Sequence, residues 1–280
     1  MLNEDIKQNS NLHWMTVSFM ALVGIFPRLK PKLWQWLYNK IASFDKAFNF
    51  LFMNYGYSNP QIPPLTLDTG DEKFRYAIQL YDHVLDGLEI NNKDVLEVGC
   101  GRGGGGSYIL RYKKPLFYVG IDLSEKAIHR CQQQHRFANA KWLQGSAEAI
   151  PVFNESVDIV VNVESSHCYP SMELFLKEVK RTLRSKGYLA FCDLRPLSSI
   201  ETLDHIIHQS GFKIINKEFI TPFVVNALDA FSHTRQHQIS STFRSIFHRA
   251  INDFAAIKNT GVYNKLVNGE LIYVSYLLQK

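Results

Sequence analysis

The sequence has few cysteines, few charged residues and no long hydrophobic run, and each shortage excludes a class of protein. Only four of the 280 residues are cysteines, and they form no C-x-x-C pair or zinc-ligand spacing. This favours reduced thiols, a cytoplasmic location and no metal site. Charged residues make up 20% and hydrophobic residues 46% of the chain, which excludes intrinsic disorder. A chain of this length can bury a sizeable core without disulfides.

The N-terminal region lacks a stretch long enough to span a bilayer. Its most apolar part, Leu12 to Phe26, has about fifteen residues, fewer than the ~20 that a spanning helix needs. The chain begins with Glu4 and Asp5 rather than the basic start of a signal peptide. From Pro31 to Leu51, apolar residues recur at spacings of three and four, which predicts an amphipathic helix.

Positive charge and tryptophan are concentrated in the same region. Residues 12–57 contain five Lys or Arg side chains, one Asp, and three of the four tryptophans: Trp14, Trp34 and Trp36. No comparable basic cluster occurs elsewhere, so no nucleic-acid partner is expected. Residues 1–70 are therefore predicted to form a helical cap, which either packs on the main domain or makes peripheral contact with a membrane.

Residues 71–280 alternate between short apolar segments and amphipathic ones. Seven strands are expected, at 94–98, 116–121, 140–144, 157–163, 188–192, 212–220 and 271–278. Helices are expected between them, among others at 107–111, 124–138 and 172–183, and a loop rich in proline and polar residues at 54–69. The alternation predicts an α/β fold with a Rossmann-like, doubly wound seven-stranded sheet. A helical insertion at 221–269 separates the last two strands, which are expected to form a final antiparallel hairpin.

A glycine-rich turn follows the first expected strand. Gly99, Gly101 and Gly104 satisfy the weak pattern G-x-G-x-x-G, and Asp122 closes the next strand, where a carboxylate can accept both hydroxyls of a ribose. These residues predict an adenosine-type ligand, and a dinucleotide dehydrogenase stays an alternative. Glu97 stands two residues before the first glycine, where it can meet a cationic amino group, and this favours a different cofactor.

Four runs in this order resemble the class I S-adenosylmethionine-dependent methyltransferases: VLEVGCGRGGG, VGIDLS, GSAEAIPVFNESVDIVVNVESSHCY and LRSKGYLAFCDLR. Three more runs narrow the resemblance: FMNYGYSNP, NVESSHCYP and AIKNTGVYNKLVNGELIY. Together they are similar to the phthiotriolone/phenolphthiotriolone dimycocerosate methyltransferases and related O-methyltransferases of lipids and polyketides. The resemblance implies S-adenosylmethionine as cofactor and an apolar small-molecule acceptor.

The resemblance also implies roles for individual residues. Glu97 would hold the amino group of the methionine part, Asp122 the ribose, and Asn162 would border the methionine part by its backbone. Many relatives have Asp where Ser146 stands, which puts the adenine contact there in doubt. The implied cofactor-binding set is Glu97, Gly99, Cys100, Gly101, Gly103, Asp122, Leu123, Ser146, Ala147 and Asn162.

Catalytic residues are expected in the loop after strand 157–163, which must face the methyl group. His167 is the natural general base for a hydroxyl acceptor, and Glu164 can orient it or act as an electrostatic partner. Two alternatives stay open. Glu164 can instead stabilise a carbocation during C-methylation of an isoprenoid or sterol, or the chain can be a non-catalytic cofactor-binding subunit.

Overall fold

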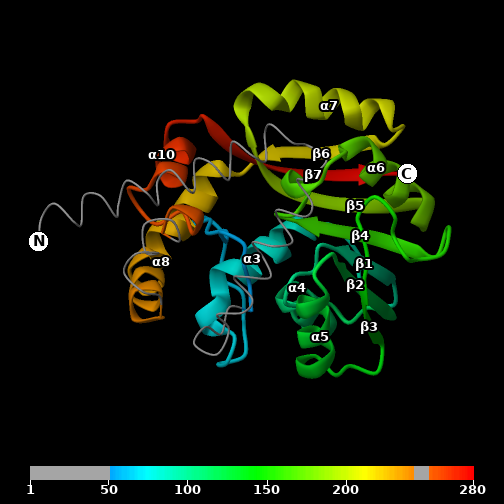
Figure 1. The fold of residues 1–280 in the computed structure, drawn as a ribbon, viewed down its shortest axis with the longest axis horizontal. Helices are drawn as coiled ribbons and strands as arrows, with labels where there is room; N and C mark the ends of the chain where they lie inside the picture. Colours follow the sequence, from blue (N-terminus) through cyan, green and yellow to red (C-terminus); the bar gives the residue numbers. More distant parts are fainter. Residues whose placement is uncertain (1–50, 243–251) are drawn as a thin grey trace, which may run out of the picture.

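A computed structural model describes residues 51–242 and 252–280 (Figure 1). Its described residues form a seven-stranded sheet in the order β3-β2-β1-β4-β5-β7-β6. Strand β7 is antiparallel to both of its neighbours, and the other pairings are parallel. The strands are β1 (Asp94–Val98), β2 (Phe117–Asp122), β3 (Ala140–Gln144), β4 (Val157–Val163), β5 (Leu183–Pro196), β6 (Lys213–Phe219) and β7 (Leu271–Gln279). The predicted Rossmann-like sheet with an antiparallel end is confirmed.

Helices cover both faces of this sheet (Figure 1). They are α3 (Arg75–Val84), α4 (Gly104–Tyr108), α5 (Glu125–Gln134), α6 (Met172–Thr182), α7 (Ile200–Gln209), α8 (Thr221–Thr242) and α10 (Gly261–Val267). Val95 of β1 belongs to the core shared with α3, α4 and α5, whereas Leu96 belongs to the core shared with α6 and α7. Because both faces are covered, β1 is apolar on both sides, as is usual for a parallel strand.

Serine side chains fix the starts of two helices. Ser124 accepts a hydrogen bond from the backbone N–H of Ala127 at the start of α5, and Ser171 accepts one from Leu174 at the start of α6. These caps satisfy donors that the helix itself leaves without partners. Both helices therefore begin close to where the sequence predicts.

Helix α4 differs from its prediction. It was expected over Ser107–Arg111, but it begins at Gly104 and continues as a π-helical turn, η3 (Ile109–Lys113). Glycine is a poor helix former, so the pattern indicated a later start. Packing decides instead, because aromatic rings lie where side chains at positions 104–106 would project.

The segment before α3 and the insertion before β7 lie at the same side of the molecule (Figure 1). Residues 51–70 contain no regular helix or strand, as predicted for the loop at 54–69. The insertion contains α8 and α10, as expected. Most of the predicted N-terminal cap lies outside the described residues, so its boundary at residue 70 stays a prediction. None of the helices within 51–242 and 252–280 is long and apolar enough to cross a membrane.

Candidate functional site

The glycine loop joins β1 to α4 at the carboxyl edge of the sheet. Gly99, Gly101 and Gly103 have φ values of +79°, +52° and +78°, in the left-handed region that favours glycine. A Cβ atom at Gly99 would clash with the side chain of Ser165, which lies in the loop after β4. The loop therefore offers bare backbone at the point where the ends of β1 and β4 meet.

Three amides of this loop hold it against β2. The N–H groups of Gly99 and Cys100 both donate to the carbonyl of Ile121, at 2.8 and 2.9 Å. The N–H of Gly101 donates to Oδ2 of Asp122 at 2.9 Å. These bonds keep the loop and Asp122 together as one unit, so a ligand that touches one also touches the other.

The Asp122 carboxylate ends β2 and is fixed by two backbone donors. Besides Gly101, the N–H of Ser124 donates to its Oδ1 at 2.8 Å. Burial raises the pKa of Asp122, and these two bonds act in the opposite direction. Leu123 is partly exposed beside it. The structure thus places a rigid hydrogen-bond acceptor where the sequence predicts the ribose site.

The residues predicted to line the adenine follow β3. Ser146 and Ala147 lie in a tight turn closed by a bridge between Ser146 and Ala149. The turn is connected to β2, because the N–H of Gly145 donates to the backbone carbonyl of Asp122 at 3.0 Å. The expected ribose and adenine residues therefore lie next to each other at one edge.

Asn162 lies near the end of β4 and is fully buried. Its Nδ2 donates to the carbonyl of Val98 at 2.8 Å and to the hydroxyl of Tyr169 at 2.9 Å. Its Oδ1 has no hydrogen-bond partner in the described part of the chain. A buried acceptor without a donor is costly, so this atom fits a ligand that brings an N–H or O–H group. The sequence predicts a contact through the backbone of Asn162, and the unpartnered Oδ1 adds a side-chain atom that could serve the same ligand.

Glu97, the residue expected to meet the cationic amino group, lies fully buried on β1. Burial raises its pKa to about 7. Among the described residues, the structure shows no salt bridge to Glu97. A buried carboxylate in this state fits a cationic ligand, because a positive charge would compensate its desolvation. Together with the Asp122 carboxylate and Oδ1 of Asn162, it gives this edge of the sheet three hydrogen-bond acceptors.

His167 is paired with a residue that the sequence did not single out. Its Nδ1 lies 2.7 Å from Oδ1 of Asp193, a fully buried carboxylate on β5. Burial lowers the pKa of His167, but the Asp193 carboxylate more than offsets this and the net pKa lies well above the usual value. The sequence does contain one indication of this role, because Asp193 is a charged residue directly after the apolar strand expected at 188–192.

Asp193 also fixes the backbone that carries His167. Its Oδ2 accepts bonds from the N–H of His167 at 2.8 Å and from the hydroxyl of Ser166 at 2.7 Å. Arg195 forms a salt bridge with the same oxygen at 2.9 Å. Burial raises the pKa of Asp193, but Arg195 and His167 lower it more, so the carboxyl stays ionised. The imidazole is thus held through both its ring and its backbone.

Glu164 is held by the segment that precedes α3. The N–H of Tyr55 donates to its Oε1 at 2.6 Å, and its φ of +47° is in the left-handed region. Burial raises the pKa of Glu164 to about 7, while the nearby Tyr273 hydroxyl and the Tyr55 bond lower it. The orienting role proposed for Glu164 is filled at Nδ1 by Asp193, and an electrostatic role for Glu164 stays a prediction.

Residues 51–58, here called the crossing segment, connect the glycine loop to the insertion. Phe52 lies against Gly104, and Met53 lies against Gly101. Further along, the Tyr55 hydroxyl donates to the carbonyl of Phe254 at 2.9 Å, and the N–H of Ser58 donates to that of Phe223. One stretch of chain therefore touches both the predicted cofactor residues and the predicted acceptor side.

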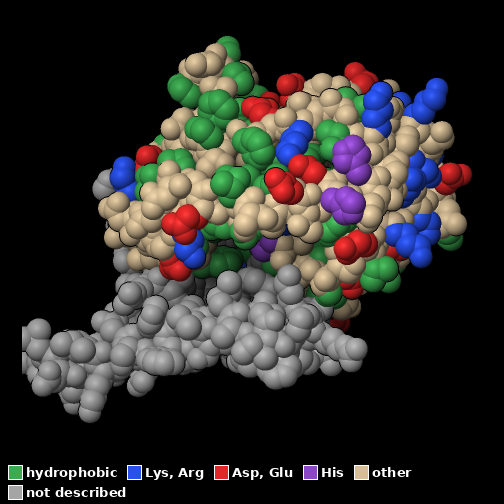
Figure 2. All heavy atoms as spheres, turned by 90° about the horizontal axis from the view of Figure 1, so that it is seen from above, with side chains coloured by type: hydrophobic (Ala, Val, Ile, Leu, Met, Phe, Trp, Pro, Cys, Tyr) green, Lys and Arg blue, Asp and Glu red, His purple; other side chains and the backbone are tan. Residues whose placement is uncertain are grey.

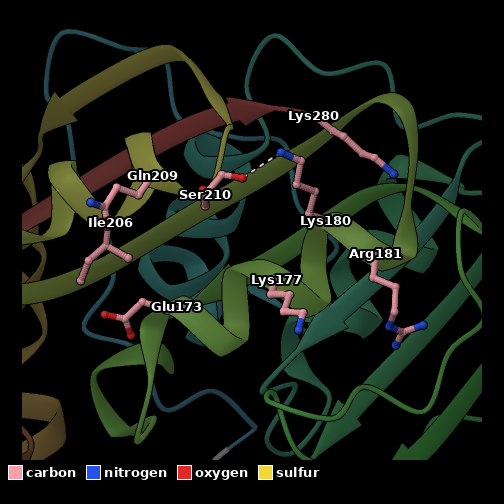
Figure 3. Close-up of a pocket in the computed structure, with 8 residues that line it drawn as sticks. All are labelled: Glu173, Lys177, Lys180, Arg181, Ile206, Gln209, Ser210 and Lys280. Carbon is pink, nitrogen blue, oxygen red and sulfur yellow. Dashed lines mark hydrogen bonds between the residues drawn. The ribbon is translucent and has the colours of Figure 1, made fainter.

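A surface hollow of about 510 Å³ lies at the other edge of the sheet, between α6 and α7 (Figure 3). Two of its lysines have structural partners. Lys180 donates to the carbonyls of Ser210 and Gly211 at the end of α7, and Lys280 donates to that of Leu183. Lys and Arg side chains also gather towards this end in Figure 2. None of the residues that line this hollow belongs to the site described above, so the two are separate.

With this geometry established, comparisons with known proteins identify the family. A protein-family model described as "Methyltransferase domain" matches residues 96–191. A phthiotriol/phenolphthiotriol dimycocerosates methyltransferase of Mycobacterium leprae is 32% identical over 94% of this chain and 97% of its own length. The chain belongs to this methyltransferase family. A fatty-acid O-methyltransferase of Mycolicibacterium smegmatis is 37% identical over 66% of this chain and 67% of its own length.

Solved methyltransferase structures share the fold. A cyclopropane synthase from Mycobacterium tuberculosis has a TM-score of 0.63 at 17% identity, covering 85% of this chain and 95% of that one. A geranyl diphosphate C-methyltransferase from Streptomyces coelicolor, solved with S-adenosyl-L-homocysteine, has a TM-score of 0.59 at 14% identity, covering 86% and 97%. These likenesses show the fold. Membership of the methyltransferase family supports S-adenosylmethionine as the cofactor, as predicted, and disfavours the dehydrogenase alternative.

Proposed function

We propose that this methyltransferase modifies a hydroxyl group of a lipid-like or polyketide acceptor, with His167 as general base. The pairing of His167 with the buried Asp193 carries the proposal. A hydroxyl must lose its proton as its oxygen is methylated, whereas an ionised carboxylate has none to lose. An imidazole oriented by a carboxylate, in the loop after β4, therefore favours a hydroxyl acceptor.

The hydrogen bond to Asp193 selects the nitrogen that acts. Because Nδ1–H donates to the carboxylate, the neutral imidazole has its basic lone pair on Nε2. Nε2 takes the acceptor proton, and Asp193 then stabilises the imidazolium that forms. This division of labour needs a hydrogen bond of the observed length and an aspartate that stays ionised, and Arg195 supports the second condition.

The cofactor supplies an electrophilic methyl group, and this chain's residues supply its position. We assign Glu97 to the amino group of the methionine part and Asp122 to the ribose hydroxyls. Oδ1 of Asn162 would accept a hydrogen bond from an N–H or O–H group of the cofactor. Alignment of the acceptor oxygen with the methyl group accounts for a large share of the rate in such a transfer. The rigid anchoring of Asp122 by two backbone amides supports this assignment.

The proposed acceptor side is the insertion at 221–269 together with the crossing segment. Hydrophobic side chains are exposed where β5, β6 and α10 end: Leu197, Phe219 and Val267 are 57%, 50% and 54% exposed. In Figure 2, hydrophobic side chains are more frequent away from the basic end of the molecule. The names of the dimycocerosates and fatty-acid methyltransferases support an apolar acceptor.

The position of the transferred methyl group tests this proposal. The protein is incubated with methyl-labelled S-adenosylmethionine and, separately, a long-chain alcohol, the matching fatty acid and an unsaturated isoprenoid. We expect label in the alcohol product as an ether that resists alkaline hydrolysis. Label found only in an ester that alkali hydrolyses would show a carboxylate acceptor and contradict the proposal. Label on a carbon atom of the isoprenoid, lost when Glu164 is replaced, would favour C-methylation instead.

We also propose a cytoplasmic protein that contacts membranes peripherally through its N-terminal segment. Trp14, Trp34 and Trp36 lie outside the described residues, whereas Trp142 is buried at 5% exposure and serves as an internal reference. Addition of anionic vesicles should shift tryptophan emission more than addition of neutral vesicles, because the segment is basic. Unchanged emission and no co-sedimentation would assign the segment to packing on the domain.

A further inference from the structure

Two tyrosine hydroxyls hold the Glu97 carboxylate. The Tyr81 hydroxyl, from α3, donates to Oε1 at 2.8 Å, and the Tyr118 hydroxyl, from β2, donates to Oε2 at 2.5 Å. All three side chains are at most 6% exposed. Both donors are neutral, so they orient the carboxylate without cancelling its charge. A cationic ligand is therefore still needed to compensate the buried charge.

The glycine run makes room for these same tyrosines. A Cβ atom at Gly105 would lie within 3.0 Å of the Tyr81 ring and hydroxyl, and one at Gly106 would lie within 3.0 Å of the Tyr118 hydroxyl. Real Cβ atoms do not approach so closely. Gly105 and Gly106 have no left-handed φ, unlike the glycines of the loop before them. Glycine is thus needed at these two positions because it leaves space for the tyrosines, and not because of its backbone conformation.

We propose that Tyr81 and Tyr118 are positioning residues for the cofactor's amino group, acting through Glu97, and that Gly105 and Gly106 provide the space they occupy. The proposal rests on the assignment of Glu97 given above. Each hydroxyl stabilises the ionised form of Glu97, because a phenol O–H donates more strongly to a carboxylate than to a carboxylic acid. Loss of one hydroxyl leaves the ring packing in place and makes Glu97 easier to protonate.

The test compares two ligands that differ in the amino-acid part alone. S-adenosyl-L-homocysteine carries the amino group, whereas 5′-methylthioadenosine has the same adenosine and a thioether without it. Calorimetry measures both with the wild type, Tyr81→Phe, Tyr118→Phe and Tyr108→Phe. Tyr108 is the matched control, because it is a buried tyrosine at the end of α4 and its hydroxyl donates to a different carboxylate, Asp82.

We expect Tyr118→Phe and Tyr81→Phe each to weaken the binding of S-adenosyl-L-homocysteine about tenfold. This is the effect of losing one hydrogen bond to a charged group. Methylthioadenosine affinity should stay within about twofold, and Tyr108→Phe should change neither. The loss in Tyr118→Phe should also grow as the pH falls from 8 to 6, as Glu97 becomes protonated.

Equal weakening of both ligands would mean that the tyrosines only pack, and no weakening would mean that they do not act through Glu97; either result overturns the proposal. A wild type that binds both ligands equally would instead overturn the assignment of Glu97 itself. These outcomes separate a failure of the tyrosines from a failure of the proposed cofactor site.

Discussion

Nδ1 of His167 and Oδ1 of Asp193 are 2.7 Å apart, although His167 lies in the loop after β4 and Asp193 lies on β5, 26 positions later in the chain. Asp193 makes His167 a stronger base but keeps it protonated to a higher pH. Burial lowers the pKa of His167, but the Asp193 carboxylate more than offsets this, so the net pKa is well above 6.5. Only the neutral imidazole accepts a proton, which gives the reaction a defined pH dependence.

Turnover should therefore rise from pH 6 towards the alkaline side. Asp193→Asn should lower turnover and move the midpoint of the profile to lower pH, because the imidazole loses its anionic partner. His167→Ala should reduce turnover by about 10²–10⁴-fold while the affinity for S-adenosylmethionine changes little. Turnover is measured against pH for the wild type, Asp193→Asn and His167→Ala. His129→Ala is the control, because His129 is exposed. Near-normal turnover in His167→Ala would show that alignment alone drives the transfer.

Asp122→Ala should weaken the binding of S-adenosylmethionine by about 10- to 150-fold. The reason is the loss of a charged hydrogen-bond acceptor, worth about 1.5–3 kcal/mol. Calorimetry with S-adenosylmethionine and with NAD measures this directly. Asp94→Ala is a suitable control, since Asp94 lies at the other end of β1 and pairs with Arg184. Unchanged affinity in Asp122→Ala would remove this residue from the cofactor site.

Gly105→Ala should lower the free energy of unfolding by about 1–3 kcal/mol, the usual cost of overpacking a core. The added methyl group would meet the Tyr81 ring, which is buried and cannot move freely. Gly70→Ala is the control, because a Cβ there meets nothing within 4 Å. Urea unfolding of both variants gives the comparison. Equal stabilities would mean that α4 can shift to accept the methyl group.

Arg195→Ala should destabilise the protein by about 3–5 kcal/mol, because it removes a cationic partner from a fully buried carboxylate. Arg184→Ala should cost only about 0–1 kcal/mol, since its salt bridges with Asp94 and Asp158 are more exposed. The pKa of Asp193 is lowered in the folded state, so its stabilisation is complete above the ordinary carboxyl pKa of about 4 and is lost as the pH falls below it. Unfolding measured at pH 7 and pH 3 distinguishes the two arginines.

Local pattern was enough to predict most of the sheet. Strands β1, β3 and β4 have the predicted bounds, because short apolar runs between polar turns leave little choice of register. Strand β5 begins at Leu183 instead of Tyr188, because Leu183 already pairs with Val157, and the polar residues 184–186 that hid this start lie in a shift of register before Tyr188. The start of α4 was missed for the opposite reason, because aromatic packing overrides the low helix propensity of glycine.

The sequence predicts those site residues that stand at the end of an expected strand, because the strand itself brings them to the carboxyl edge of the sheet. Glu97, Asp122 and Asn162 follow this rule and lie at or near the carboxyl ends of adjacent strands. Asp193 could not be paired with His167 from spacing, because the contact depends on how β4 and β5 are aligned in the sheet. The contact of Tyr55 with Glu164 spans 109 positions and no local pattern contains it.

Strand β7 comes last along the described chain but lies between β5 and β6. Before residues 271–279 have left the ribosome, β5 has an open edge and β6 has no partner at all. Parallel pairing of the earlier strands can begin during synthesis, but the sheet is completed only by the final strand, after the long insertion has been made. The nascent protein therefore exposes the edge of β5 until β7 has been made, and pairing of that edge with another chain is favoured most during that interval.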